Sequence, residues 1–130
     1  MSQENVEIVR RSFDAFKEGN VSGMLELMAD DLITHRSDPD GATYHGKEGF
    51  FQATADWIEG FEEWTATPEG FIDAGDYVLV RVLQTARGKE SGVPVESDFW
   101  FVFGLRGDKI ARLSFYVRES EALEAAGLSE

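Results

Sequence analysis

The feature that most constrains the fold is an apolar run from Phe99 to Phe103. In an extended strand, successive side chains point to opposite faces, so Phe99, Phe101 and Phe103 share one face. Trp100 and Val102 share the other face. A strand with one solvated face alternates apolar and polar residues, whereas this run is apolar on both faces. We therefore expect a strand of a sheet that is covered on both sides.

Other segments of the second half also have the composition of strands, and short turn sequences separate them. The predicted strands are 64–72, 77–87, 95–105 and 109–117. The turn before the last strand contains Arg106, Gly107 and Asp108, which favours a tight hairpin. The second half of the chain therefore predicts an antiparallel meander.

Helices are predicted before these strands. Val6, Val9, Phe13 and Phe16 follow one another at helical spacing, which places them on one side of a first helix. Gly19 is a suitable residue for its C-terminal end. The remaining predicted elements are a second short helix that ends at Asp30 and Asp31, a strand at 32–36, a loop at 37–46, a third helix from residue 47 and a terminal helix at 119–126. Helices segregated from an antiparallel sheet indicate an α+β fold.

Three N-terminal helices can cover one face of this sheet, so the other face needs a different cover. A second copy of the chain is the simplest one, and we expect a homodimer through the outer sheet face. The alternative is a monomer that leaves Trp100 exposed.

Composition excludes several classes of function. The chain has 130 residues, with 12 Lys and Arg against 25 Asp and Glu, and a formal net charge of −13. This charge repels nucleic acid and anionic membranes, and we expect neither as a partner. The absence of cysteine excludes thiol catalysis and disulfides. The sequence shows no secretory signal and no apolar run long enough to span a bilayer, so we expect a cytoplasmic protein.

The chain resembles the SnoaL-like branch of the nuclear transport factor 2-like superfamily over nearly its whole length. The segments that carry the resemblance are SQENVEIVRRSFDAFKEGNVSGMLELMADDL, YHGKEGFF, FIDAGDYVLVRV and LRGDKIARLSFYVRESEALEAAGL. The resemblance implies a single SnoaL-like domain over 1–130. It also implies a cone, or cystatin-like roll, in which a curved antiparallel sheet wraps around three N-terminal helices and leaves a pocket at the open end. Dimers through the outer sheet face are common in this superfamily.

The acid–base residues of known enzymes with this fold do not carry over to this sequence. The position of the ketosteroid isomerase oxyanion tyrosine falls at or beside Ser12, and the position of the general-base aspartate falls at Arg36. The positions that correspond to the polyketide cyclase histidine and aspartate hold Phe101 and Phe115. Arg36 stays protonated and cannot act as the general base, and Phe101 and Phe115 are apolar.

His35 and Asp98 are the candidate catalytic residues. The imidazole of His35 titrates near neutral pH and lies where the early strand approaches the expected pocket. The alternative for His35 is a histidine at a strand end that bonds to the backbone or lies at a dimer surface. Asp98 is the carboxyl group in the centre of its strand, but alternation places it opposite the phenylalanine row. With Arg81, Asp98 would supply two members of the Asp-Arg-Asp set of epoxide-hydrolase-like relatives.

Two arginines are candidate ligand-binding residues. Arg36 is suited to a carboxylate or phosphate on a ligand, and its alternative partners are Asp38 and Asp40. Arg81 lies in the middle of a strand and requires a partner there, either across the strands at Glu96 or Asp98 or on a ligand.

Aromatic side chains are the remaining candidates, because they can wall an organic ligand. The aromatic ligand-binding candidates are Tyr44, Trp57, Phe99, Phe101, Phe103, Phe115 and Tyr116. His35 and His45 do not have the spacing of a zinc site, and we expect neither a metal nor another cofactor.

These observations predict a domain that binds a small, mainly apolar organic molecule. The first alternative is a metal-free isomerase, or a polyketide-cyclase-like or epoxide-hydrolase-like enzyme, with His35 as its acid or base. The second alternative is a dimeric interaction module with a vestigial pocket.

Overall fold

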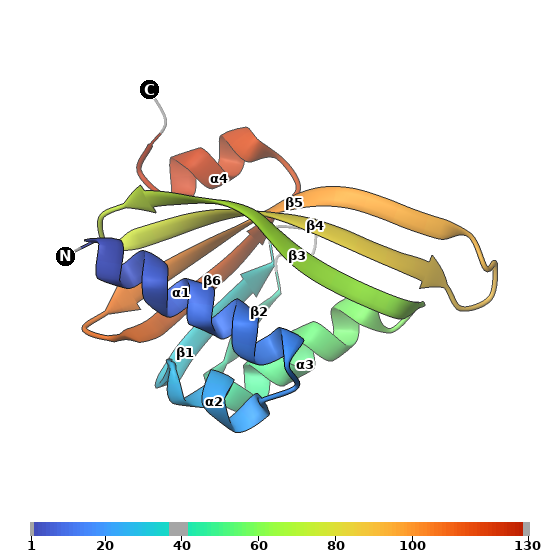
Figure 1. Ribbon diagram of the computed structural model, residues 1–130, viewed down its shortest axis with the longest axis horizontal. Helices are drawn as coiled ribbons and strands as arrows, with labels where there is room; N and C mark the ends of the chain where they lie inside the picture. The colour runs from blue at the N-terminus through green and yellow to red at the C-terminus, as the bar shows by residue number, and fades with distance from the viewer. Residues whose placement is uncertain (1, 37–41, 129–130) are drawn as a thin grey trace.

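The computed structural model describes residues 2–36 and 42–128. Its elements, in chain order, are α1 (Ser2–Lys17), α2 (Val21–Glu26), β1 (Met28–Arg36), β2 (Thr43–His45), α3 (Gly46–Ile58), β3 (Phe61–Ala74), β4 (Tyr77–Gly88), β5 (Pro94–Arg106), β6 (Lys109–Tyr116) and α4 (Glu119–Ala125). Figure 1 shows a curved sheet with α1, α2 and α3 on one face and α4 on the other. The predicted α+β fold is confirmed.

The six strands form one sheet in the order β2-β1-β6-β5-β4-β3. Strands β3 to β6 form the predicted antiparallel meander, and long runs of paired residues join β4 to both neighbours. The early strand β1 lies between β2 and β6, and it runs parallel to β6. The sheet is therefore antiparallel except for this one pair. It is open, with β2 and β3 at its edges.

The boundary between α2 and β1 differs from the prediction. The helix ends at Glu26, and Asp30 and Asp31 lie inside β1 instead of ending the helix. Both carboxylates are exposed, while Leu32 beside them is fully buried. The predicted loop at 37–46 contains a short strand, since residues 43–45 pair with β1 as β2.

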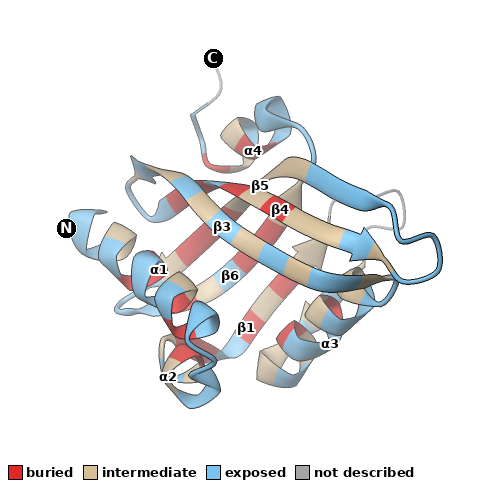
Figure 2. Cartoon of the chain, turned by 45° about the vertical axis from the view of Figure 1, so that its right-hand side comes forward, coloured by how far each residue is buried: buried red, intermediate tan, exposed pale blue. Residues whose placement is uncertain are grey.

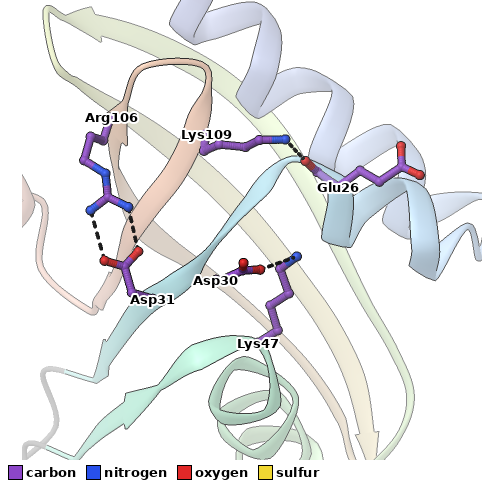
Figure 3. Close-up of polar contacts among 6 residues, drawn as sticks. All are labelled: Glu26, Asp30, Asp31, Lys47, Arg106 and Lys109. Carbon is purple, nitrogen blue, oxygen red and sulfur yellow. Dashed lines mark hydrogen bonds and ion pairs between the residues drawn. The ribbon is translucent and has the colours of Figure 1, made fainter.

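Ion pairs explain why the strand accommodates these two aspartates. Arg106 donates two hydrogen bonds to the Asp31 carboxylate, at 2.6 and 3.2 Å, and Lys47 lies 3.2 Å from Asp30 (Figure 3). Nearby, Lys109 donates to the backbone carbonyl of Glu26. The hydrogen bonds of Arg106 hold the pKa of Asp31 below its ordinary value. The two ion pairs attach α3 and the β5–β6 hairpin to β1, and the Lys109 bond joins β6 to α2.

The main core lies between the inner sheet face and the N-terminal helices (Figure 2). Its fully buried members are Val9, Leu32, Val78, Val80, Val82 and Ile110. The three valines occupy alternate positions of β4, so this strand presents a continuous apolar row to the helices.

A second, smaller core lies on the outer face of the sheet. Here Ala122 and Ala126, at the C-terminal end of the chain, pack against Leu79 of β4 and Val102 of β5. Trp100 packs against the same cluster and is partly buried. The chain therefore supplies its own cover for part of the face on which we expected a second subunit. The homodimer stays a prediction.

None of the helices in the described part of the chain is long and apolar enough to cross a membrane.

Candidate functional site

A cavity of about 80 Å³ lies between the inner sheet face and helices α1 and α3. Its wall is predominantly aromatic. The lining residues are Ser12, Phe13, Phe16, Met24, Met28, Phe50, Thr54, Trp57, Trp64, Ala66, Gln84, Phe99, Phe101, Phe103, Leu113 and Phe115.

The phenylalanine row of β5 forms one side of the cavity, as strand alternation predicts. Phe101 contacts Phe115 of the adjacent strand β6 edge to face, with ring centroids 4.7 Å apart. Phe13 of α1 lies over the same row, stacked on Phe101 and edge to face with Phe103, with ring centroids 6.2 and 5.8 Å apart. Stacked and edge-to-face arrangements are both favourable between aromatic rings, so the wall is held by its own packing.

Gln84 of β4 connects two tryptophans of the wall. Its carboxamide oxygen accepts hydrogen bonds from the indole nitrogens of Trp57, at 2.7 Å, and Trp64, at 2.9 Å. Gln84 is only 6% exposed, and it follows Val78, Val80 and Val82 in the inward row of β4. A buried carboxamide requires such partners, because burying an unpaired polar group costs free energy.

A β-bulge in β3 sets the direction of Trp64. The pairing of β3 with β4 shifts register between Glu62 and Thr65, and Glu63 has a left-handed φ of 55°. An extra residue in one strand bends it locally and changes where the next side chain points. Trp64 follows this residue directly and forms part of the cavity wall.

Trp57 of α3 is held on three sides. In addition to its bond to Gln84, its ring lies 5.2 Å from Phe99, edge to face. The Arg36 guanidinium lies over the indole, 5.5 Å from the ring centroid. This distance is within the range of a cation–π interaction.

The other polar side chains of the wall direct their hydroxyl hydrogens into their own helices. Ser12 donates to the carbonyl of Val9 at 2.6 Å, and Thr54 donates to the carbonyl of Phe50 at 3.0 Å. Within the part of the chain that the structure describes, no ionisable side chain lines the cavity. These described lining residues therefore offer no ionisable group for proton transfer at neutral pH.

His35 does not line the cavity. In the register of β1 with β6, Thr34 pairs with the lining residue Leu113, and His35 pairs with Ser114. Alternation then places His35 on the face opposite Thr34. Its Nδ1 lies 3.1 Å from the hydroxyl of Thr43 on β2. The predicted acid–base role of His35 gains no support from this position.

Asp98 and Arg81 pair with each other on the outer sheet face. An Arg81 guanidinium nitrogen lies 2.8 Å from a carboxylate oxygen of Asp98, and Glu69 is a second, more distant partner at 3.9 Å. The hydrogen bond from Arg81 to Asp98 raises the pKa of Arg81. Tyr116 lies on the same face, beside the cluster under α4. The predicted site residues Arg81, Asp98 and Tyr116 are therefore not part of the cavity wall.

Arg36 and Tyr44 are not among the residues that line the cavity. Tyr44 donates to the Asp56 carboxylate at 2.9 Å, and Arg36 approaches the Tyr44 hydroxyl at 3.5 Å. The predicted alternative partners of Arg36, Asp38 and Asp40, lie outside the described residues. The predicted ligand-binding residues that do line the cavity are Trp57, Phe99, Phe101, Phe103 and Phe115.

Gln84 is the lining residue of chemical interest that the sequence analysis missed. The signal was present in the sequence, because the inward row of β4 is apolar at Val78, Val80 and Val82 and then changes to a carboxamide. A polar residue that interrupts an apolar row requires an internal partner or a ligand.

Among the described residues, no group of three or more His, Asp or Glu side chains is arranged to hold a metal ion.

Solved structures of several proteins share this fold. A nuclear transport factor 2-like protein from Burkholderia xenovorans is 29% identical, with 97% of each chain covered and a TM-score of 0.73. A protein from Mesorhizobium loti, provisionally named a SnoaL-like polyketide cyclase, is 27% identical over 85% of this chain and 97% of its own, with a TM-score of 0.69. A nuclear transport factor 2-like protein of unknown function from Burkholderia pseudomallei is 20% identical, with 93% and 95% covered and a TM-score of 0.77.

A search of the curated proteins finds no match. The family model of the SnoaL-like domain matches residues 9–113, which include most of the cavity wall and all strands but the end of β6. With the fold and this match in agreement, the chain belongs to the SnoaL-like domain family of the nuclear transport factor 2-like superfamily.

Proposed function

We propose that this protein binds a small, uncharged, mainly apolar organic molecule in the aromatic cavity, without acid–base chemistry at the cavity wall. The observation that carries the proposal is the wall itself, which is rich in aromatic rings and contains no ionisable side chain among the described residues. Concave, largely apolar sites with few polar groups are typical of small-molecule binding.

The described part of the wall has no charged residue, and this argues for an uncharged ligand. An ion that enters an apolar cavity loses its hydration, and only a nearby opposite charge or several hydrogen bonds can compensate for that loss. The net charge of −13 opposes anions further.

The cavity volume argues for a small ligand. About 80 Å³ is less than the roughly 150 Å³ of an engineered protein cavity that binds benzene. A ligand with one ring therefore requires a small displacement of the wall. Phe16 is the side chain best placed to move, because it is 39% exposed and contacts Trp64 only edge to face, with centroids 5.7 Å apart.

An enzyme is the second candidate, and the observation that favours it is the provisional polyketide cyclase name of the Mesorhizobium loti structure. A metal-free isomerase or cyclase with His35 as its acid or base requires this side chain to act from the sheet face opposite Leu113. The geometry of the cavity supports binding better.

The tryptophans provide the test. Of the three in the chain, Trp57 and Trp64 line the cavity and Trp100 lies on the outer face. In a Trp100→Phe variant, indole emission therefore reports on the cavity alone. We expect toluene to change this emission and to raise the melting temperature, whereas benzoate and benzylammonium do neither.

An Ala66→Leu variant is the control, because Ala66 lines the cavity and a larger side chain fills part of it. We expect this variant to bind toluene more weakly. The proposal would be contradicted if toluene, benzoate and benzylammonium bound equally well. It would also be contradicted if toluene changed neither the emission nor the melting temperature up to its solubility limit.

A further inference from the structure

We infer that the carboxamide nitrogen of Gln84 is the polar recognition group of the cavity, and that the ligand is a neutral carbonyl compound whose oxygen accepts a hydrogen bond from it. This inference rests on the proposed binding function and specifies the chemical class of the ligand.

The two indoles fix the orientation of the Gln84 carboxamide. An indole N–H can only donate, so the atom that faces Trp57 and Trp64 at 2.7 and 2.9 Å must be the amide oxygen. Rotation of the amide by half a turn would bring its NH₂ group against two donors and lose both hydrogen bonds. The nitrogen, Nε2, therefore lies on the side away from the indole nitrogens.

Nε2 has two hydrogens to donate and no acceptor within residues 2–36 and 42–128. It is also not among the polar atoms that the described chain seals completely from solvent. Since Gln84 is 94% buried and belongs to the cavity wall, the space that Nε2 retains is the cavity. A buried amide N–H without a partner costs free energy, and a ligand oxygen would remove that cost.

The rest of the wall determines which acceptor fits. Ser12 and Thr54 donate their hydroxyl hydrogens to backbone carbonyls, and both indole N–H groups donate to the Gln84 oxygen. Among the described lining residues, Nε2 is therefore the side-chain donor that is left for a ligand. The lining residues that the structure describes include no cation to balance a carboxylate or phosphate. An uncharged carbonyl oxygen, such as that of a ketone, an ester or a quinone, accepts a hydrogen bond without needing a counter-charge. The surrounding rings provide the contact for an apolar or aromatic skeleton.

Arg36 strengthens this donor from outside the cavity. Its guanidinium lies 5.5 Å from the ring centroid of Trp57, whose N–H donates to the Gln84 oxygen. Hydrogen bonds in series polarise one another, so a cation beside the first donor increases the acidity of the last. Arg36 is thus a positioning residue for the Gln84 amide.

Two isosteric ligands test the inference. Acetophenone carries a carbonyl oxygen where α-methylstyrene carries a methylene group, and the two have nearly the same shape. In Gln84→Met, which keeps the length of the side chain and removes its N–H groups, we expect acetophenone to bind roughly tenfold more weakly. We expect α-methylstyrene to bind equally well or more tightly. Gln3→Met makes the same chemical change on the exposed surface of α1, away from the cavity wall, and should alter neither affinity.

A spectrum of the wild-type protein keeps the test valid if Gln84→Met does not fold. In a ¹H–¹⁵N correlation spectrum, the Gln84 side-chain NH₂ signals should move downfield with acetophenone and not with α-methylstyrene. If both ligands bind and Gln84→Met weakens them by the same factor, or if the NH₂ signals respond equally to both, Gln84 does not recognise the carbonyl. If neither ligand binds the wild-type protein, the proposed binding function itself fails.

Discussion

The Trp57–Gln84 hydrogen bond makes a quantitative prediction about stability. Trp57→Phe keeps an aromatic ring and removes the N–H that donates to Gln84 at 2.7 Å. A hydrogen bond of this kind contributes about 1 kcal/mol net, and the weaker interaction of Arg36 with a phenyl ring costs a few tenths more. We expect the free energy of unfolding to fall by about 1 to 1.5 kcal/mol.

Gln84→Met should cost more, because it removes the acceptor of two donors at once. Trp57 and Trp64 are both partly buried, and each loses its partner. At about 1 kcal/mol for each orphaned N–H, the expected loss is about 2 kcal/mol. In the double variant Trp57→Phe/Gln84→Met, one of these donors is absent. The combined loss should therefore be about 1 kcal/mol smaller than the sum of the single losses.

Urea unfolding followed by far-ultraviolet circular dichroism measures all three free energies, since tryptophan emission changes with the substitutions themselves. Trp100→Phe combined with Gln84→Met is the matched control. Trp100 lies on the opposite face of the sheet, so its effect should add to that of Gln84 within about 0.5 kcal/mol. Additivity of Trp57→Phe and Gln84→Met to the same precision would refute the hydrogen bond as the link between them.

Three further predictions concern the wall, the bulge and the ion pair of β1. Phe101→Ala should lower the free energy of unfolding by about 3 kcal/mol, which urea unfolding measures, and should let the cavity accept naphthalene, which a ligand titration checks. If the variant bound naphthalene no better than the wild-type protein does, the position of Phe101 in the wall would be contradicted. Glu63→Gly should stabilise the protein by about 0.5 kcal/mol. The free energy gained by relieving the left-handed backbone exceeds the free energy lost with the exposed ion pair to Arg87 at 3.4 Å. A lower melting temperature would show that the backbone at residue 63 is not strained. Because Arg106 lowers the pKa of Asp31, the pair stabilises the fold above the ordinary aspartate pKa of about 4 and loses this effect as pH falls through the lower folded-state value. The urea midpoints of wild type and Asp31→Asn should therefore differ at about pH 7 and converge at about pH 2, whereas a difference that grew in acid would reverse the assigned sign.

Most of the fold follows from local sequence patterns. The period-two pattern around Phe101 and the helical spacing of Val9, Phe13 and Phe16 depend only on neighbouring residues, and the structure has the predicted strand and helix there. The start of β1 was predicted incorrectly because Asp30 and Asp31 are poor strand residues by local preference. Their partners, Lys47 and Arg106, come from distant segments.

The cavity was predictable only in part, for a similar reason. Alternation identified the face of Phe99, Phe101 and Phe103, because it is a property of one strand. The side of the sheet on which His35 lies depends on the register of β1 against β6, which is a property of two strands. The partners of Gln84 lie 20 and 27 residues away, so no local pattern indicated that its oxygen was already occupied.

The parallel pairing of β1 with β6 also bears on how the chain reaches its native state. Met28 pairs with Ile110 and Arg36 with Phe115, so an early strand gains its neighbour only when nearly the whole chain is present. Contacts between segments so far apart close a long loop, and they slow folding. During synthesis on the ribosome, one edge of β1 stays unpaired until β6 has been made. An unpaired strand edge is a site of aggregation. A nascent chain that ends before residue 109 should thus be prone to self-association, and the cavity should form only in the last stage of folding.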